Sequence, residues 1–197
     1  HNHWIERKKI DVSVYQKINV KKENFIRDVD HLIEEGYYGL NVTVPLKEDA
    51  YKYCDNTSDV ARTLKAVNTL IVNKDGVYGD NTDPIGFEKS IANRELNKKL
   101  CVVLGAGGSA RAVVYALTQM KCEIGIYNRT KENAESLCSD LGVKATILTE
   151  TTISEFVGSS HLVVNTTSLG QQEGEENNLI DFNSLNSSAH VYDLIYN

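Results

Sequence analysis

Apolar residues recur every three to four positions between residues 21 and 35, which is the spacing of one face of a helix. That face carries Phe25, Ile26, Val29, Leu32 and Ile33. Gly36 follows, at a position where a glycine commonly ends a helix. Residues 13–20 and 37–44 flank this helix and are rich in β-branched and aromatic residues, which predicts a strand on each side. A strand–helix–strand unit favours parallel pairing of its two strands.

A hairpin and a second helix are predicted next. Residues 69–81 contain two short apolar runs around Asp75-Gly76, a dipeptide that favours a tight turn between antiparallel strands. Residues 87–99 are predicted to be helical. Asp83 and Pro84 stand at the start of this helix, where aspartate suits the cap and proline suits the first turn.

Strands and helices alternate through the rest of the chain. The charged stretch 93–99 ("NRELNKK") marks the predicted boundary between a first domain, residues 1–98, and a second domain, residues 99–197. The expected strands of the second domain are "LCVVL", "EIGIYNRT", "KATIL", "HLVVNTT" and "AHVYDLIY". Helical patterns separate the earlier strands. This alternation is typical of a doubly wound α/β sheet, so the predicted fold class is α/β with two domains.

Charge and composition exclude several classes of function. The net charge of −6 argues against nucleic acid as the main partner, because binding phosphate backbones needs a basic face. No apolar run approaches the length of a membrane span, and no secretory signal precedes the globular pattern. The four cysteines lack C-x-x-C spacing and the histidines lack metal spacing, which favours reduced thiols in a cytoplasmic protein without a metal. The oligomeric state stays open, with a homodimer as one option.

A glycine-rich turn follows the strand "LCVVL" and opens a helical pattern. The stretch "LGAGGSA" places Gly105, Gly107 and Ala110 in a G-x-G-x-x-A pattern. In this context the first glycine permits a tight turn, the second lets the backbone approach a pyrophosphate, and the alanine lets helix pack on strand. The helix N-terminus adds N–H groups for the phosphates. A tight turn without any ligand is the alternative.

The end of the following strand indicates which dinucleotide binds. NAD-binding proteins usually carry an acidic residue there to hold the ribose 2′-hydroxyl. This chain has Asn128, Arg129, Thr130 and Lys131 instead. Arginine and lysine attract a 2′-phosphate, which a carboxylate would repel. The turn therefore predicts NADP rather than NAD, and a solvated basic turn is the alternative.

Three further polar residues lie at the ends of predicted elements: Lys47, Asn68 and Asp83. Such ends can converge at one rim of a domain. Taken singly, each has an ordinary structural explanation: a surface lysine, a turn asparagine and a helix cap. Composition and spacing alone leave both explanations open.

Six motifs in order, "NVTVPLK", "AVNT", "NTDPIGF", "GAGGSAR", "NRT" and "NTTSLG", resemble the shikimate dehydrogenase family over essentially the whole chain. The resemblance implies a substrate domain and an NADP-binding Rossmann domain with a cleft between them, and reduction of 3-dehydroshikimate to shikimate with NADPH. It implies that Lys47 and Asp83 are catalytic. The implied substrate-binding residues are Thr43, Lys47, Asn68, Asp83 and Tyr196. The implied cofactor-binding residues are Gly105, Ala106, Gly107, Gly108, Ser109, Ala110, Asn128, Arg129, Thr130, Lys131, Asp59, Thr166, Ser168 and Leu194.

The chain departs from the family pattern at several points. In the family, a first strand with a Ser-x-Ser pair for the substrate carboxylate comes before the His-Asn that opens this chain. The family pattern also has a last strand and helices beyond the point where this chain ends. We therefore expect a trimmed or partly ordered chain with an incomplete substrate site. Lys65 replaces a usual glycine before "AVNT". Asn133 replaces a basic residue, which leaves the NADP preference to residues 129–131.

The resemblance suggests a mechanism in which Lys47 gives a proton to the oxyanion formed by hydride transfer, and accepts it in reverse. Burial would lower the pKa of this lysine, whereas a neighbouring Asp83 would raise it. Three alternatives remain: a non-catalytic NADP-binding regulator, another Rossmann enzyme such as a folate dehydrogenase, and a relative that prefers quinate. Intact Lys47 and Asp83 argue against the first, and the "NVTVPLK" and "NTDPIGF" motifs argue against the second.

Overall fold

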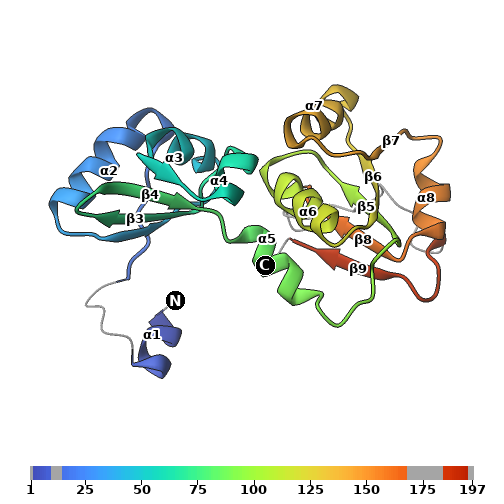
Figure 1. Cartoon of the computed structure of the whole chain (residues 1–197), viewed down its shortest axis with the longest axis horizontal. Helices are drawn as coiled ribbons and strands as arrows, with labels where there is room; N and C mark the ends of the chain where they lie inside the picture. The colour runs from blue at the N-terminus through green and yellow to red at the C-terminus, as the bar shows by residue number, and fades with distance from the viewer. Residues whose placement is uncertain (1, 10–14, 168–183, 195–197) are drawn as a thin grey trace. The chain divides into compact units, whose positions relative to one another are not determined.

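A computed structural model describes residues 2–9, 15–167 and 184–194 (Figure 1). Residues 1–37 and residues 38–197 form two compact units. The second unit contains two sheets, one within residues 39–80 and one within residues 100–193. The α/β fold class is confirmed. The boundary expected after residue 98 falls between the two sheets and stays a prediction.

The first unit contains helix α1 (Asn2–Lys8), a 3₁₀ turn (Lys22–Asn24) and helix α2 (Phe25–Glu34). Three of the five residues assigned to the apolar face of α2 are buried: Phe25, Val29 and Leu32. Ile26 is 63% exposed, so it lies off that face. Gly36 has φ +92°, the left-handed conformation in which glycine ends helices without strain.

The strand predicted at residues 13–20 is not found at residues 15–20, and residues 13 and 14 lie outside the described residues. A strand exists only through hydrogen bonds with a neighbouring strand, whatever its local propensity. The predicted parallel pairing of the strands before and after α2 is therefore also wrong for the described residues. The strand after α2, β1 (Gly39–Asn41), pairs antiparallel with a strand 30 residues further on, with Leu40 opposite Leu70.

The first sheet has the strand order β1-β3-β4-β2. The predicted hairpin is confirmed: β3 (Thr69–Asn73) and β4 (Gly76–Asp80) are antiparallel and joined by a two-residue turn. The short strand β2 (Asn56–Thr57) pairs parallel with β4. Helix α3 (Lys47–Tyr53) precedes β2, and helix α4 (Asp59–Leu64) lies between β2 and β3. Ser58 caps α4, because its hydroxyl accepts a hydrogen bond from the Ala61 N–H.

Helix α5 (Asp83–Ser90) stands between the two sheets in the sequence. It begins at Asp83, one residue earlier than predicted: Thr82 rather than Asp83 takes the cap position, and Pro84 lies in the first turn as expected. The prediction that it continues to residue 99 was wrong. Ile91 and Leu96 are buried, but their five-residue spacing does not match a helical face, and the chain turns between them with Arg94 N–H bonded to the Ile91 carbonyl.

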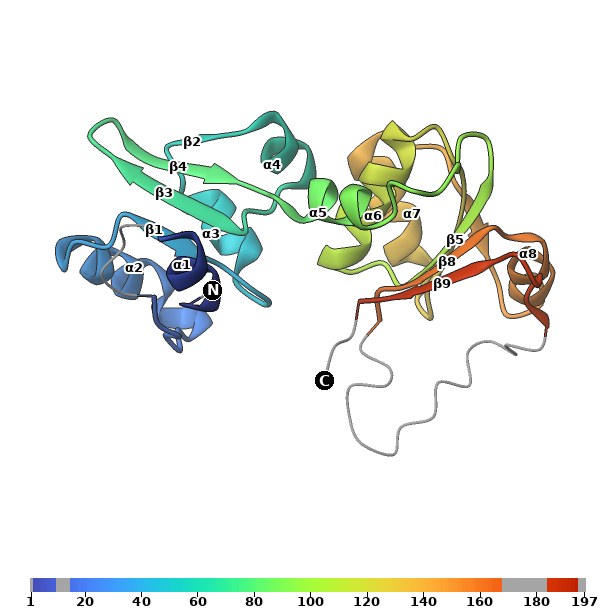
Figure 2. The same ribbon diagram turned by 90° about the horizontal axis from the view of Figure 1, so that it is seen from below.

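The second sheet has the order β7-β6-β5-β8-β9, and all its strands are parallel. The strands are β5 (Leu100–Leu104), β6 (Glu123–Tyr127), β7 (Thr146–Leu148), β8 (Leu162–Asn165) and β9 (His190–Asp193). Helices α6 (Gly108–Gln119), α7 (Lys131–Leu141) and α8 (Ile153–Ser159) connect the first four strands. Figure 2 shows β5, β8 and β9 running side by side. The predicted alternation of strands and helices is confirmed.

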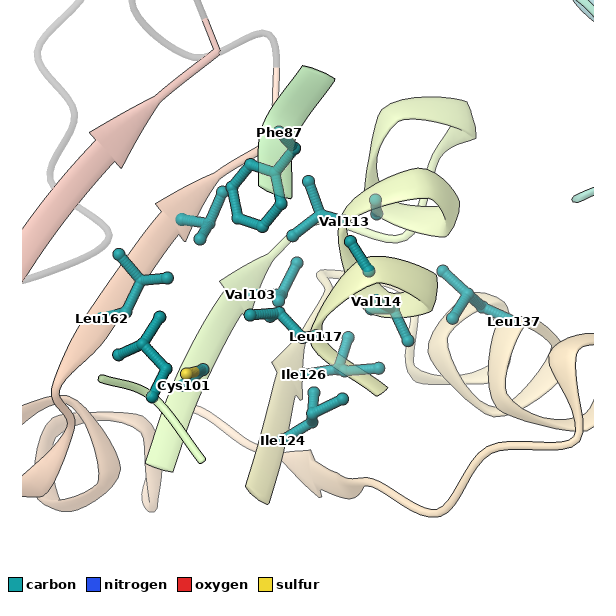
Figure 3. Packing of buried hydrophobic residues seen from close by; sticks show 14 of the residues in the cluster. Phe87, Cys101, Val103, Val113, Val114, Leu117, Ile124, Ile126, Leu137 and Leu162 are labelled. Carbon is teal, nitrogen blue, oxygen red and sulfur yellow. The ribbon is translucent and has the colours of Figure 1, made fainter. Parts of the chain in front are cut away.

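Side chains that alternate along each strand build a separate core on each face of this sheet. On β5, Cys101 and Val103 point into one core that also contains Phe87 of α5, Val113 of α6 and Leu137 of α7 (Figure 3). Val102 and Leu104 face the opposite side and pack with residues of α8. Because helices cover both faces, β5 is apolar at every position, as expected for a central parallel strand. No helix within the described ranges combines the length and apolar character needed to cross a bilayer.

Candidate active site

Lys47, Asn68 and Asp83 meet around one carboxylate. The Lys47 ammonium donates a hydrogen bond from Nζ to Asp83 Oδ2 at 2.7 Å. The Asn68 amide donates from Nδ2 to Asp83 Oδ1 at 2.8 Å. Both carboxylate oxygens are therefore held, so the Asp83 side chain is oriented from two directions. The sequence named all three residues, and the structure brings them together.

Backbone hydrogen bonds fix the segments that bear these side chains. Lys47 is the first residue of α3, and its carbonyl accepts a hydrogen bond from the Val67 N–H at 2.9 Å. The next residue, Asn68, donates its N–H to the Asp80 carbonyl at 3.0 Å. The lysine and asparagine are thus tied together through main chain as well as through Asp83, which limits how far either can drift from the site.

Asn81 is a supporting residue that the sequence analysis did not single out, although it lies in the "NTDPIGF" motif. Its side chain is buried at 5% exposure. Its amide nitrogen donates to the Ala66 carbonyl at 3.0 Å, and its oxygen accepts from the Asp83 N–H at 3.1 Å. A buried amide satisfied in this way fixes its neighbours. Asn81 therefore connects the segment before Asn68 to the first residue of α5.

The lysine is mostly shielded from solvent. Its side chain is 17% exposed and that of Asp83 is 34% exposed. Lysine is rarely buried to this extent unless it is paired, and here the partner is the carboxylate. An ammonium has three donors, and the described chain records one of them on Asp83. The remaining donors can bind an oxygen of a small molecule placed beside the pair.

Two other sequence-predicted site residues, Thr43 and Asp59, make no hydrogen bond with this cluster within the described part of the chain. Thr43 is exposed, and its carbonyl accepts from the Leu46 N–H. The Asp59 side chain is 94% exposed and pairs with Arg62 on the same helix at 2.8 Å, a geometry that gives no support to a cofactor role. Tyr196 and Ser168 lie outside the described residues. Within the described ranges, no three His, Cys, Asp or Glu side chains gather closely enough to hold a metal ion.

The glycine-rich turn between β5 and α6 has the geometry of a phosphate cradle. Gly105 has φ +103°, and a Cβ there would lie 2.7 Å from Thr166 Oγ1, so only glycine fits. Gly107 and Gly108, in contrast, border open space, with no atom within 4 Å of a Cβ built on either. Ala110 is fully buried under the turn. The N–H groups of the first turn of a helix have no intrahelical acceptor, so those of α6 can bind the oxygens of a pyrophosphate.

The basic turn after β6 is shaped by Asn128, whose amide donates to the Thr130 carbonyl at 2.7 Å. Arg129 is exposed, and no ion pair of this residue is recorded in the described chain. Lys131 pairs with Glu135 at 3.0 Å, and the hydrogen bond that its ammonium donates to this carboxylate raises the pKa of the lysine. Lys131 is therefore engaged with Glu135, whereas Arg129 has no recorded ion pair within the described residues.

Thr166 lies directly beside the glycine turn. Its hydroxyl donates to the Leu104 carbonyl at 2.6 Å. Asn165, which the sequence analysis passed over, is 3% exposed at the end of β8 and accepts from the Thr167 hydroxyl at 2.7 Å. Leu194 follows β9 and donates its N–H to the Asn165 carbonyl. The parallel strands therefore bring Thr166 and Leu194 to the carboxyl edge of the sheet, where the glycine turn also lies.

Two family models match the chain. The model of the shikimate dehydrogenase substrate binding domain matches residues 1–70, and that of shikimate / quinate 5-dehydrogenase matches residues 88–194. A shikimate dehydrogenase (NADP(+)) from Roseobacter denitrificans is 38% identical over 207 residues, which cover 100% of this chain and 73% of that protein. This chain belongs to the shikimate dehydrogenase family.

Solved structures agree with this membership. The crystal structure of shikimate dehydrogenase from Aquifex aeolicus has a TM-score of 0.91 with this chain at 31% identity, covering 100% of this chain and 72% of that one. A shikimate 5-dehydrogenase from Thermus thermophilus, crystallised in complex with NADP(H) and shikimate, has a TM-score of 0.83 at 27% identity. It covers 98% of this chain and 70% of that chain. The resemblance noted in the sequence is confirmed.

Two glycine substitutions separate the structural and binding parts of the shikimate dehydrogenase turn. Gly105→Ala forces a positive φ on alanine and a contact with Thr166, so we expect a loss of about 1–3 kcal/mol in the free energy of unfolding. Gly108→Ala adds its methyl group to open space on a helix, so stability is expected to be kept while NADPH affinity falls. Urea unfolding and NADPH fluorescence titration measure the two effects. Unchanged NADPH binding in Gly108→Ala would show that phosphate does not lie over this residue.

Proposed function

We propose that this protein catalyses the reversible, NADPH-dependent reduction of 3-dehydroshikimate to shikimate. The main support is the Lys47–Asp83–Asn68 cluster, which lies on the same chain as a dinucleotide-type glycine turn. The Roseobacter denitrificans relative is named shikimate dehydrogenase (NADP(+)), and the Thermus thermophilus structure holds NADP(H) and shikimate. Both observations fit a site in which a cofactor and a small polyol meet.

The cluster suits a substrate that bears hydroxyl groups beside a ketone. Asp83 accepts hydrogen bonds, Lys47 donates them, and the nearby Thr82 hydroxyl lies 3.1 Å from the Asn68 amide nitrogen. Neighbouring donors and acceptors of this kind can bind the hydroxyls of a polyol in one orientation. The lysine is the acidic group of the cluster, so we place it against the substrate oxygen that changes protonation state.

Bound NADPH supplies a hydride to the carbonyl carbon of the substrate. The carbonyl oxygen gains negative charge as the C–H bond forms, and the Lys47 ammonium stabilises this charge and then transfers a proton to it. Asp83 holds the ammonium in place before the transfer and helps to keep the neutral amine oriented afterwards. In the reverse direction the neutral lysine accepts the proton of the alcohol. Asn68 orients Asp83 and so positions the lysine indirectly.

NADP is the proposed cofactor because the cradle and the basic turn fit it. The open space over Gly107 and Gly108 leaves room for a pyrophosphate. Arg129 can form two parallel hydrogen bonds with a 2′-phosphate.

We further propose that residues 1–98 form the substrate domain and residues 99–197 the cofactor domain. A cytoplasmic location is the accompanying proposal, supported by the free state of all four cysteines.

A substrate and cofactor panel tests the proposed function. The assay of the purified protein follows the absorbance of the reduced nicotinamide. Dehydroshikimate is tested with NADPH and with NADH, and shikimate and quinate are tested with NADP⁺ and with NAD⁺. We expect the highest kcat/KM for dehydroshikimate with NADPH and for shikimate with NADP⁺. Preference for quinate would instead place the protein with quinate-oxidising relatives, and nucleotide binding without turnover would indicate a regulator.

Lys47→Ala tests the proton-transfer role. Loss of a positioned general acid typically lowers kcat by about 10²–10⁴-fold, and we expect a loss in this range with NADPH affinity near that of the wild type. Lys52→Ala, an exposed lysine on the same helix α3, is the matched control and should retain its kcat. Near-wild-type kcat in Lys47→Ala would rule out the assigned role.

Arg129→Asp tests the cofactor choice. A carboxylate at this position repels a 2′-phosphate and can accept from a ribose hydroxyl, so KM for NADPH should rise by at least about tenfold while KM for NADH changes little. Lys144→Asp is the charge-reversal control, because Lys144 precedes β7 and so lies towards the opposite edge of the parallel sheet. Equal losses with NADPH and NADH in Arg129→Asp would contradict a 2′-phosphate contact.

A further inference from the structure

Arg111 joins three helices of the second unit. Its Nε donates to the Leu64 carbonyl, at the end of α4, at 3.1 Å. Its Nη1 donates to Asp140 Oδ2, near the end of α7, at 3.0 Å. Arg111 itself belongs to α6, the helix that opens with the glycine turn. The Lys65 ammonium also approaches Asp140, at 3.6 Å.

The contacts of Arg111 with Leu64 and Asp140, called the Arg111 joint below, are largely buried and so differ from a surface ion pair. The Arg111 side chain is 16% exposed, and Leu64 is 1% exposed. The Leu64 carbonyl is among the last of α4, where helical carbonyls have no intrahelical donor, so Arg111 satisfies it. Around the joint pack buried Leu64, Ala66 and Ala112, with Tyr115 and Leu141 against them. A guanidinium buried to this extent requires a carboxylate partner, which Asp140 provides.

Asp140 is held in the charged form by this arrangement. The hydrogen bond from Arg111 is the main cause that lowers the pKa of the Asp140 carboxyl, and the nearby Lys65 charge adds to it. The Lys65 contribution is weaker because its side chain is 60% exposed. Lys65 also has φ +52°, a left-handed conformation that is unfavourable for any residue with a Cβ and that ends α4. The Lys65 backbone therefore ends helix α4, and its side chain is a weaker partner of Asp140 than Arg111 is.

Each side of the joint lies close in sequence to one half of the candidate active site. Arg111 stands four residues after Gly107 of the phosphate cradle. The carbonyl that it holds belongs to Leu64, four residues before Asn68. Within residues 64–68, the Ala66 carbonyl accepts a hydrogen bond from the Asn81 amide, and the Val67 N–H donates one to the Lys47 carbonyl. Arg111 therefore connects the first turns of α6 to the segment that carries Asn68, the residue that orients Asp83.

We propose that Arg111, held by Asp140, is a positioning residue that couples the cofactor cradle to the substrate-binding cluster. It fixes residues 64–68 against the cofactor-binding helix, so that NADP⁺ and shikimate each strengthen the binding of the other. Coupling of this kind is reciprocal by thermodynamic necessity. The inference rests on the proposed function, because it assigns NADP⁺ to the cradle and shikimate to the Lys47 cluster.

Titration calorimetry of the complete protein tests the coupling. The dissociation constant of shikimate is measured with and without saturating NADP⁺, and the ratio of the two values is the coupling factor. For the wild type we expect a factor of at least about five, at the lower end of typical allosteric coupling. In Asp140→Asn and Arg111→Met the factor should fall towards one, while the dissociation constant of NADP⁺ measured alone stays near the wild-type value.

Matched variants separate positioning from general damage. Lys65→Gly removes the weaker partner and relieves the left-handed strain, and Asp75→Asn makes the same chemical change as Asp140→Asn on the exposed hairpin turn. Both should keep the wild-type coupling factor; Asp75→Asn should also keep the wild-type melting temperature, and Lys65→Gly should match or exceed it. Arg111→Lys keeps a charge but cannot bond to both partners in the same fork, so it should lower the coupling as well. If Arg111→Met does not fold, Arg111→Lys and Asp140→Asn provide the result.

The outcomes distinguish this inference from the proposed function. Wild-type turnover of shikimate together with unchanged coupling factors in Asp140→Asn and Arg111→Lys would overturn the positioning role alone. A wild-type coupling factor of one would overturn it equally. A wild type that binds neither shikimate nor dehydroshikimate would overturn both proposals.

Discussion

The Asp83 carboxylate accepts hydrogen bonds from Lys47 and Asn68 on its two oxygens, and the arrangement of the candidate active site depends on it. The three residues come from the start of α3, the segment before β3 and the start of α5. A lysine that is 17% exposed needs a nearby negative charge, and a carboxylate that meets it needs hydrogen bonds to hold its direction. Each of the two contacts therefore restricts the other. The hydrogen bonds of Asn81 and Val67 extend this restriction to the neighbouring backbone.

The parallel sheet imposes a second constraint, on the cofactor side. Parallel strands bring their carboxyl ends to one edge, so the turns after β5, β6 and β8 lie together. The glycine turn, the Arg129 turn and Thr166 occupy these three positions. Cores on both faces of the sheet support this edge, with α5, α6 and α7 on one side and α8 on the other. The Arg111 joint connects the sheet's cofactor side to the segment that ends at Asn68.

Much of the fold followed from local pattern, because turn residues and short, continuous apolar runs mark its elements. The β3–β4 hairpin, the glycine turn, and strands β5, β6 and β8 lie where the sequence predicted them. Errors arose where pairing or termination depended on distant residues. Residues 15–20 have strand-like composition but form no strand, and α5 ends at Ser90 because turns bury Ile91 and Leu96 without helical spacing. Local propensity does not contain this information.

The sequence by itself determined the residue types of the site and the family. Lys47, Asn68, Asp83 and the glycine pattern are visible as motifs, since chemistry restricts which residues can serve at each point. Only the tertiary structure decided which of them touch: that both oxygens of Asp83 are bound, that Lys131 is paired with Glu135, and that Arg111 reaches Leu64 and Asp140. Most of these contacts join residues that are far apart in the sequence. Distances between such residues are set by packing rather than by spacing along the chain.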